Sequence, residues 1–379
     1  MKKITIIGGG IGGLTLAAGL KQQGIDFEVY EATDQYKDAG AGIIWQINTM
    51  QALDRLGLAA PVQEHGAAIG KYSTRDVNDE ILMENDWEGT FKDEFGFTTH
   101  GIYRSTFQDI LVDRVGNEHI TMNKECVGVE PDGESVDVRF ADGSETDAEF
   151  VVGADGMHSA VRESVFDHSV AYLDCVTHRG LSEWTPPSEL EDVAWNVHTT
   201  DGNIGFVPLE PDTRKGYWFF TMHDEQISWE TDDERKAELL ALANSMPDRV
   251  RNVIEATPAD AILSVDVPYV PPMETWTKEN VTLLGDAAHG MTPHAAQGGG
   301  MAIEDAVALS EALGDNDSID AVLEEYESVR VERANEFVER SLEHGRGAIS
   351  NSPEPIEALR HAPPEAIERQ ARRDYTLPF

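Results

Sequence analysis

Three short glycine-rich segments carry acidic residues, and each follows a strand-like apolar run of the sequence. The first is residues 8–13, with Glu31 further along; the second is residues 153–156; the third is residues 285–286. Glycine lets the backbone approach a phosphate closely, and a carboxylate can accept hydrogen bonds from ribose hydroxyls. One such segment is common in proteins, but three in order indicate a nucleotide site assembled from separated parts.

The first segment lies inside a predicted strand–helix–strand unit. Residues 4–7 predict a buried parallel strand, and apolar residues at helical spacing follow the glycines. Gly8 allows a tight turn, Gly10 allows a pyrophosphate to approach, and Gly13 allows the helix to pack on the strand. Glu31, at the end of the second strand, can bind both hydroxyls of an adenosine ribose. The unit predicts a bound dinucleotide, against the alternative of a structural glycine turn, but not which dinucleotide.

The second and third segments stand at the ends of further buried strands. Residues 149–152 and 281–284 predict these strands, so Asp155 and Asp286 can reach a ligand beyond the carboxyl ends of a sheet. The simpler alternative for Asp155 is a turn residue. Glycines at 298–300 open a later helix, whose free N–H groups form a second candidate anion site.

Between these segments lies a region of different character. Residues 167–272 alternate aromatic-rich strands with turns, and residues 232–246 predict an amphipathic helix. Residues 71–83 predict two further strands, and residues 85–90 predict a turn. We expect a second domain built on an antiparallel sheet with helices on one side.

The composition indicates a large globular protein with an acidic surface. The chain has 379 residues, 40% of them hydrophobic, and no apolar run approaches the roughly twenty residues of a membrane span. Seventy acidic against 29 basic residues give a net charge of −41, spread along the whole chain. Binding to nucleic acid is disfavoured because the field repels it. A first strand so near the start argues against a cleavable signal, and we expect a cytoplasmic protein.

Neither the cysteines nor the histidines are spaced as metal ligands. Cys126 and Cys175 lie far apart without CxxC spacing, so we expect reduced, buried thiols rather than a disulfide. His289 and His294 are the closest histidine pair, and their spacing fits no common zinc pattern. We therefore expect no metal site.

Taken in order, these motifs resemble those of FAD-dependent monooxygenases of the aromatic-hydroxylase type, which share the fold of para-hydroxybenzoate hydroxylase. The resemblance covers most of residues 1–345. It rests on the N-terminal fingerprint, the "DG" motif of residues 153–156 with Ser159 and Arg162, the "GD" motif of residues 285–289 with Pro293, and residues 297–299 and 302–306. It departs from the family at Ala296, where many members have glycine, and after Glu31, where Ala32, Thr33 and Asp34 replace a basic residue.

The resemblance implies an α/β fold. A three-layer, Rossmann-like FAD-binding domain would be interleaved with a second domain on a mostly antiparallel sheet, and C-terminal helices would follow. The implied limits are residues 1–71, 98–166 and 275–345 for the FAD-binding domain, 72–97 and 167–274 for the substrate domain, and 346–379 for a helical tail. The sequence leaves open whether the chain forms a homodimer.

The resemblance also implies roles around a tight, non-covalent FAD. Glu31 would bind the adenosine ribose, Arg104 would lie along the pyrophosphate and ribityl chain, and Asp286 would hold the ribityl hydroxyls. Asp155 would contribute to FAD and NAD(P)H binding. N–H groups at the start of the glycine-rich helix would stabilise negative charge on the reduced flavin. The implied cofactor-binding residues are Gly8, Gly10, Gly13, Glu31, Ala41, Gly42, Arg104, Asp155, Gly285, Asp286, Pro293, Gly298 and Gly299.

The implied reaction uses NADH or NADPH as a transient co-substrate, after which O2 forms a flavin C4a-hydroperoxide. One oxygen atom would hydroxylate or epoxidise a small, aromatic or cyclic substrate between the flavin and the second sheet. Tyr217, Trp218, Phe206 and His294 are substrate candidates by position only, and core packing is the stronger alternative for each aromatic. His294 and Tyr217 are the candidates for catalysis. A reductase of isoprenoid lipids, or a non-catalytic flavin- or nucleotide-binding protein, would share the FAD motifs.

The charge leads to a first prediction. Nineteen of the 29 basic residues are arginine, and with the excess of acids this indicates a host with a very salty cytoplasm. We expect the melting temperature to rise from low to multimolar salt, because high ionic strength screens the self-repulsion. Thermal unfolding at both salt concentrations measures this, and equal stability would contradict the interpretation.

Overall fold

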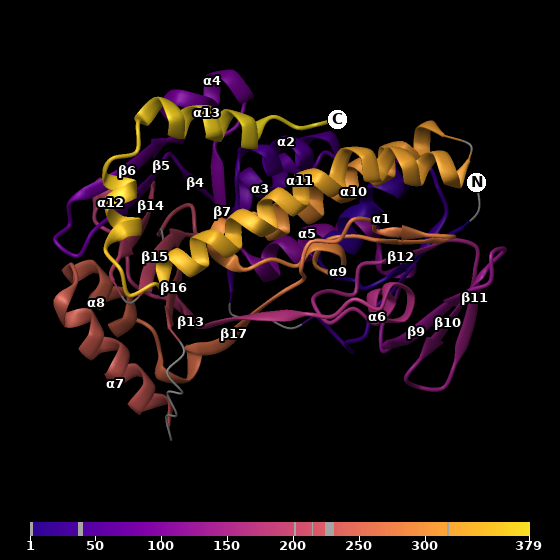
Figure 1. Cartoon of the computed structure of the whole chain (residues 1–379), viewed down its shortest axis with the longest axis horizontal. Helices are drawn as coiled ribbons and strands as arrows, with labels where there is room; N and C mark the ends of the chain where they lie inside the picture. The colour runs from indigo at the N-terminus through magenta and orange to yellow at the C-terminus, as the bar shows by residue number, and fades with distance from the viewer. Residues whose placement is uncertain (1–2, 37–40, 201, 214, 224–230, 317) are drawn as a thin grey trace.

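The computed structural model describes residues 3–36, 41–200, 202–213, 215–223, 231–316 and 318–379. A six-stranded sheet, in the order β18–β19–β12–β1–β2–β8, forms the centre of the N-terminal part (Figure 1). All neighbouring strands run parallel except β18 and β19. Their bounds are β1 Ile4–Ile7, β2 Phe27–Tyr30, β8 Ile120–Thr121, β12 Val151–Gly153, β18 Thr277–Lys278 and β19 Val281–Leu283. Strands from three separate parts of the chain, residues 4–30, 120–153 and 277–283, therefore share one sheet.

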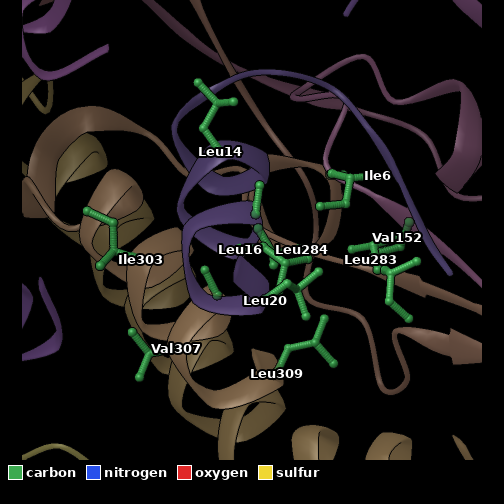
Figure 2. Packing of buried hydrophobic residues seen from close by; sticks show 14 of the residues in the cluster. Ile6, Leu14, Leu16, Leu20, Val152, Leu283, Leu284, Ile303, Val307 and Leu309 are labelled. Atoms are coloured by element: carbon green, nitrogen blue, oxygen red, sulfur yellow. The ribbon is translucent and has the colours of Figure 1, made fainter. Parts of the chain in front are cut away.

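Helix α1 (Ile11–Gln23) lies between this sheet and helix α10 (Gly298–Asp315). Leu16 and Leu20 belong to a core cluster that also contains Leu284 and Ile303, as Figure 2 shows. Because α1 is covered on both sides, residues 13–20 are all buried. The helix ends as predicted at Gly24, whose φ of 71° is a left-handed value that favours glycine.

The second large sheet has seven strands in the order β17–β13–β16–β15–β14–β5–β6. Only β14 and β5 pair in parallel. The strands are β5 Lys71–Arg75, β6 Ile81–Asp86, β13 Ala171–Ser182, β14 Val193–His198, β15 Gly202–Pro208, β16 Gly216–His223 and β17 Leu263–Tyr269. Helices α7 (Asp232–Leu242) and α8 (Asp248–Glu255) cover its outer face (Figure 1). The expected α/β fold with a mostly antiparallel second sheet is confirmed.

Two three-stranded sheets and the remaining helices complete the fold. The small sheets are β11–β10–β9 and β3–β7–β4, with β3 Gly42–Trp45, β4 Ala67–Ile69, β7 Thr99–Tyr103, β9 Cys126–Pro131, β10 Val136–Phe140 and β11 Glu145–Ala148. The helices are α2 Ile47–Arg55, α3 Ala59–His65, α4 Lys92–Phe95, α5 Arg104–Val115, α6 Ala160–Phe166, α9 Asp286–His289, α11 Ile319–Ala348, α12 Glu354–Arg360 and α13 Pro364–Tyr375. The long helix α11 runs diagonally across the molecule (Figure 1).

The turn predicted for residues 85–90 is wrong. Strand β6 continues to Asp86, and a π-helical turn follows at Trp87–Phe91. Trp87 and Phe91 are buried, and Trp87 Nε1 donates a 2.6 Å hydrogen bond to the Tyr375 hydroxyl of α13. The C-terminal helix thus covers a segment that its polar sequence made look like a surface turn.

The limits of the two domains stay a prediction, although the seven-stranded sheet does take strands from both 72–97 and 167–274. Across the described ranges, no helix combines the length and the apolar character that crossing a membrane needs.

The contact between α1 and α10 leads to a second prediction. The added methyl of Gly19→Ala would lie 2.5 Å from Oγ of Ser310, so we expect the free energy of unfolding to fall by about 1–3 kcal/mol. Gly314→Ala is the matched control, because its methyl would meet only the flexible Gln23 side chain; we expect a gain of up to about 1 kcal/mol. Urea unfolding measures both, and equal free energies for the two variants would contradict this packing.

Candidate active site

The three glycine–acid segments come together at the carboxyl ends of three adjacent strands, β1, β12 and β19. A Cβ on Gly8 (φ 108°) would lie 2.2 Å from the carbonyl oxygen of Ala154, so the first two segments are in contact. A Cβ on Gly285 (φ 63°) would lie 3.0 Å from Cβ of Ala302, so the third segment packs on α10. Parallel pairing therefore gathers residues separated by more than a hundred positions at one edge of the sheet.

The glycines of the fingerprint differ in what surrounds them. A Cβ on Gly13 would lie 2.0 Å from the carbonyl oxygen of Gly8, so this glycine is needed for packing. A Cβ on Gly10 would meet no atom within 4 Å. Gly10 is the N-cap of α1, which has no side-chain cap, so the first N–H groups of the helix face open space. This arrangement fits a pyrophosphate.

Glu31 is held in place by the segments on both sides of it. Its Oε2 accepts a 2.7 Å hydrogen bond from the backbone N–H of Gly9. Its Oε1 accepts hydrogen bonds from the N–H (2.9 Å) and the hydroxyl (2.8 Å) of Thr33. Thr33, which departs from the family pattern, therefore orients the carboxylate. Gln108 of α5 adds a 2.9 Å hydrogen bond to the Gly9 carbonyl.

Asp155 and Arg162 hold the second segment together from inside. Asp155 accepts hydrogen bonds from the Ser159 hydroxyl (2.5 Å) and from the N–H of Val161 (3.2 Å), at the start of α6. The fully buried Arg162 donates to the carbonyls of Met157 (2.7 Å) and Ala287 (2.9 Å). Burial raises the pKa of Asp155, and these hydrogen bonds oppose that shift. In this structure Asp155 holds the start of α6, and Arg162 ties α6 to α9; a direct contact of Asp155 with FAD or NAD(P)H stays a prediction.

Asp286, the first residue of α9, has an exposed side chain although residues 281–285 and 287–290 are buried. The surrounding protein still desolvates its carboxylate and raises its pKa, while the charges of His289, Arg104 and Arg162 oppose this. An accessible acid among buried neighbours is suited to hydrogen bonds with a polyhydroxyl chain. The backbone N–H of Arg104 donates a 3.0 Å hydrogen bond to Ala41, which joins α5 to the predicted flavin loop. Ala39 and Gly40 of that loop lie outside the described residues.

The first turn of α10 has no side-chain cap, and one side of it packs against the protein. Its N-cap, Gln297, makes no side-chain hydrogen bond to the first turn. A Cβ on Gly299 would lie 2.9 Å from the buried ring of Trp45, whereas one on Gly298 would meet only Met291, at 3.4 Å. The free N–H groups of this turn can therefore face a ligand with negative charge. Ala296 has a φ of 51°, which explains why glycine suits this position, and Pro293 is exposed nearby.

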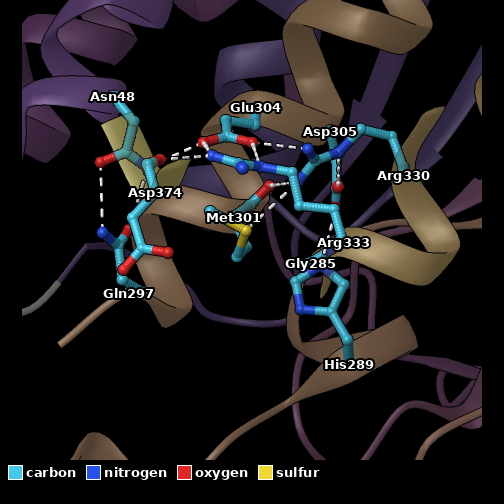
Figure 3. Close-up of polar contacts among 10 residues, drawn as sticks. All are labelled: Asn48, Gly285, His289, Gln297, Met301, Glu304, Asp305, Arg330, Arg333 and Asp374. Atoms are coloured by element: carbon cyan, nitrogen blue, oxygen red, sulfur yellow. Dashed lines mark hydrogen bonds and ion pairs between the residues drawn. The ribbon is translucent and has the colours of Figure 1, made fainter. Parts of the chain in front are cut away.

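A buried ionic network lies behind this turn (Figure 3). Arg330 of α11 donates to Oε2 of Glu304 (2.5 Å) and to Oδ1 of Asp305 (2.8 Å), and all three side chains are fully buried. Asp305 also accepts hydrogen bonds from Nε2 of His289 (2.6 Å) and from the N–H of Gly285 (3.0 Å). Burial opposes ionisation, but the charges of His289 and Arg330 hold the pKa of Asp305 below its usual value.

The remaining contacts of Glu304 connect the network to Gln297, in the predicted flavin-binding segment 293–299. Arg333 donates to both carboxylate oxygens of Glu304, at 2.7 and 2.9 Å. Asn48 of α2 donates to Glu304 (2.7 Å) and exchanges 3.1 Å hydrogen bonds with Gln297. Arg333 also binds the carbonyl of Asp374 in the C-terminal helix (2.7 Å). None of the partners of Glu304 and Asp305 was singled out by sequence for this role, because nothing in a helix sequence states which distant acid an arginine meets.

The four substrate candidates divide into two groups. Trp218 and Phe206 lie in the core beneath α7 and α8, so core packing is their role. Tyr217 is half-buried on the opposite face, where a Cβ on Gly42 would lie 2.6 Å from the Tyr217 Cβ. His294 is half-buried, and both of its ring nitrogens lack a hydrogen-bond partner. Burial, with His344 and His198 nearby, lowers the pKa of His294 to about 4.

Neither cysteine forms a disulfide within the described residues, and Cys175 is buried while Cys126 is only partly so. Within the described ranges, no three His, Cys, Asp or Glu side chains gather in a way that could hold a metal ion.

Comparison with known proteins identifies similar chains. The model of a family described as "FAD binding domain" matches residues 1–341. An aurachin C monooxygenase/isomerase from Stigmatella aurantiaca is 33% identical, over 90% of this chain and 88% of the relative. An FAD-dependent urate hydroxylase from Mycolicibacterium vanbaalenii is 32% identical, over 89% and 87% of the two chains. The structure of Klebsiella pneumoniae HpxO with FAD and uric acid has a TM-score of 0.89 and 26% identity, and covers 99% of this chain and 96% of that chain.

The different surroundings of Gly10 and Gly13 lead to a third prediction. Gly10→Ala should change the free energy of unfolding of the cofactor-free protein by no more than about 1 kcal/mol, because its methyl meets open space. The same methyl would occupy the predicted pyrophosphate position, so FAD affinity should fall about tenfold or more. Gly13→Ala, the matched control, should lose about 1–3 kcal/mol of stability because of its clash with Gly8. Urea unfolding without FAD and fluorescence titration with FAD measure the two effects, and unchanged FAD affinity in Gly10→Ala would contradict the assignment.

Proposed function

Since this chain belongs to the FAD-binding domain family and its relatives are FAD-dependent monooxygenases and hydroxylases, we propose that it hydroxylates a small aromatic or heterocyclic compound with NAD(P)H and O2. The relatives are named for aurachin C and urate, which supports a ring substrate in general and not either compound in particular.

One observation carries the proposal. The bare N-terminus of α10 and the accessible carboxylate of Asp286 lie at the same end of the six-stranded sheet as the open Gly10. FAD has phosphates, a polyhydroxyl chain and a ring that gains negative charge. The open Gly10 suits the phosphates, the Asp286 carboxylate suits the hydroxyl groups, and the N-terminus of α10 suits the ring. When bound, the flavin supplies electron transfer from NAD(P)H and the activation of O2.

The side chains of this chain supply binding, orientation and electrostatics. The first turn of α10 presents its positive dipole end where negative charge would develop, and the buried network keeps that turn in place. His294 is neutral at pH 7, because its pKa is lowered to about 4, so it can accept a proton or a hydrogen bond from a substrate hydroxyl. We propose that a substrate contacts His294, in the loop before α10, and Tyr217, on the seven-stranded sheet.

A turnover assay gives the fourth prediction. Protein purified in high salt should be yellow, and a panel of phenols, benzoates, quinolones and polyketide-like rings should contain compounds that accelerate NAD(P)H oxidation in air. Mass spectrometry should then find a product heavier by one oxygen atom, labelled when 18O2 is used. Protein that stays colourless after FAD addition would contradict the proposal. Equally fast turnover without O2, with a reduced product, would instead support the isoprenoid-type reductase.

A further inference from the structure

The seven-stranded sheet has two unlike faces. Trp218 and Phe220 of β16 are buried in the apolar core under α7 and α8. Tyr217 and Phe219, which alternate with them along the strand, are half-buried on the other face. That inner face is defined by Tyr217, Phe219 and the residues in register with them, and strand alternation places the polar residues Arg179, Asn196 and Asn203 on it as well. A polar face that is neither core nor outer surface indicates contact with a ligand.

Arg179 is the cation of this inner face. It pairs in register with Phe219 across β13 and β16. The Leu181–Tyr217 pair lies two positions further along the same two strands. Arg179 interacts with Tyr217: burial raises the pKa of that hydroxyl, and the positive charge opposes the shift. Throughout the described part of the chain, no carboxylate lies within 4 Å of the Arg179 guanidinium, and its Nε is buried without a hydrogen-bond partner. A half-buried cation without an anion is costly unless a ligand supplies one.

The two ends of the inner face meet the two predicted flavin loops. At one end, Tyr217 packs on Gly42, the first residue of β3 and the end of the predicted flavin loop. At the other end, His198 of β14 lies close enough to His294 to help lower the pKa of that histidine. The unpartnered ring nitrogens of His294 therefore border the same face as Arg179. A molecule on this face would lie beside both loops.

The middle of the inner face combines an aromatic ring with amide groups beside it. Gly205 stands between Asn196 and Phe219 in the register of the sheet, and a Cβ there would lie 2.5 Å from the Phe219 ring. The ring of Phe219 thus lies over the Gly205 backbone. Asn196 is joined to Asn203 by a 3.4 Å hydrogen bond, and Oδ1 of Asn203 is buried without a partner. Such a surface fits a planar ring with hydrogen-bonding substituents.

We propose that Arg179 is a specificity-determining residue, which binds an anionic oxygen of a planar ring substrate and selects it over a neutral isostere. The anionic oxygen is a carboxylate or an ionised ring hydroxyl; both place a negative oxygen where the guanidinium can donate. The Phe219 ring supports the plane of the substrate, and Tyr217 positions the guanidinium. This inference rests on the proposed function, because it assumes that the substrate occupies the inner face beside the flavin.

The test compares matched ligand pairs on the FAD-loaded protein at fixed ionic strength. Each pair joins a ring acid to its neutral analogue, such as 2-hydroxybenzoate with 2-hydroxybenzamide, or a hydroxyquinoline with its methyl ether. Binding is followed by the change in flavin absorbance. We expect the wild-type protein to prefer the acid, and Arg179→Gln to weaken acid binding about tenfold or more while leaving the neutral analogue nearly unchanged. Arg179→Lys should keep part of the preference.

Arg251→Gln is the control, because it makes the same change of charge at an exposed site beside Glu255; its preference should equal that of the wild-type protein. Equal weakening of acid and neutral analogue in Arg179→Gln, or no weakening, would overturn the role of Arg179 alone. A flavin spectrum that no ring compound perturbs in the wild-type protein would overturn this inference together with the proposed function. FAD content and basal NAD(P)H oxidation of every variant show whether the cofactor site is intact.

Discussion

The buried ion pairs of Arg330 with Glu304 and Asp305 are the interaction on which the site depends. All three side chains are fully buried, so each charge is stable only while its partners stay in place. Removing one partner from such a group typically costs about 3–5 kcal/mol, because the remaining charge is left without compensation. The network also binds Gly285 before α9 and Asn48 of α2. Segments that meet only in three dimensions are thereby fixed relative to one another.

The contacts of this network explain how helix α10 can begin with three glycines and still keep a fixed position. Residues 298–300 have no side chains with which to anchor the first turn, because a Cβ on Gly299 or Gly300 would collide with Trp45 or Thr49. Close packing against Trp45 and the hydrogen bonds of Gln297 with Asn48 supply the stiffness from behind. The front of the turn then remains free. An active site needs both properties, since preorganised N–H groups stabilise charge without moving during the reaction.

The sequence predicted what local patterns encode, and it missed what distant contacts decide. The roles of Gly8, Gly13 and Gly24 follow from strand–turn–helix geometry, so spacing alone was sufficient. Thr33 is only two residues from Glu31, yet its role depends on a loop conformation that no pattern specifies. The partners of Arg330 lie about 25 positions away, and the partner of Trp87 lies 288 positions away. No periodicity carries that information, which is why the turn predicted at 85–90 was wrong.

The negative charge of the chain and the position of Arg179 both affect how an anionic substrate can be recognised. A net charge of −41 repels anions at long range, so a site for an anionic substrate cannot rely on steering. In concentrated salt the Debye length falls to roughly 3 Å, and both the repulsion and any steering disappear. Only contacts at hydrogen-bond distance then discriminate between ligands. A half-buried guanidinium is screened less than one on the surface, so the position of Arg179 suits recognition under those conditions.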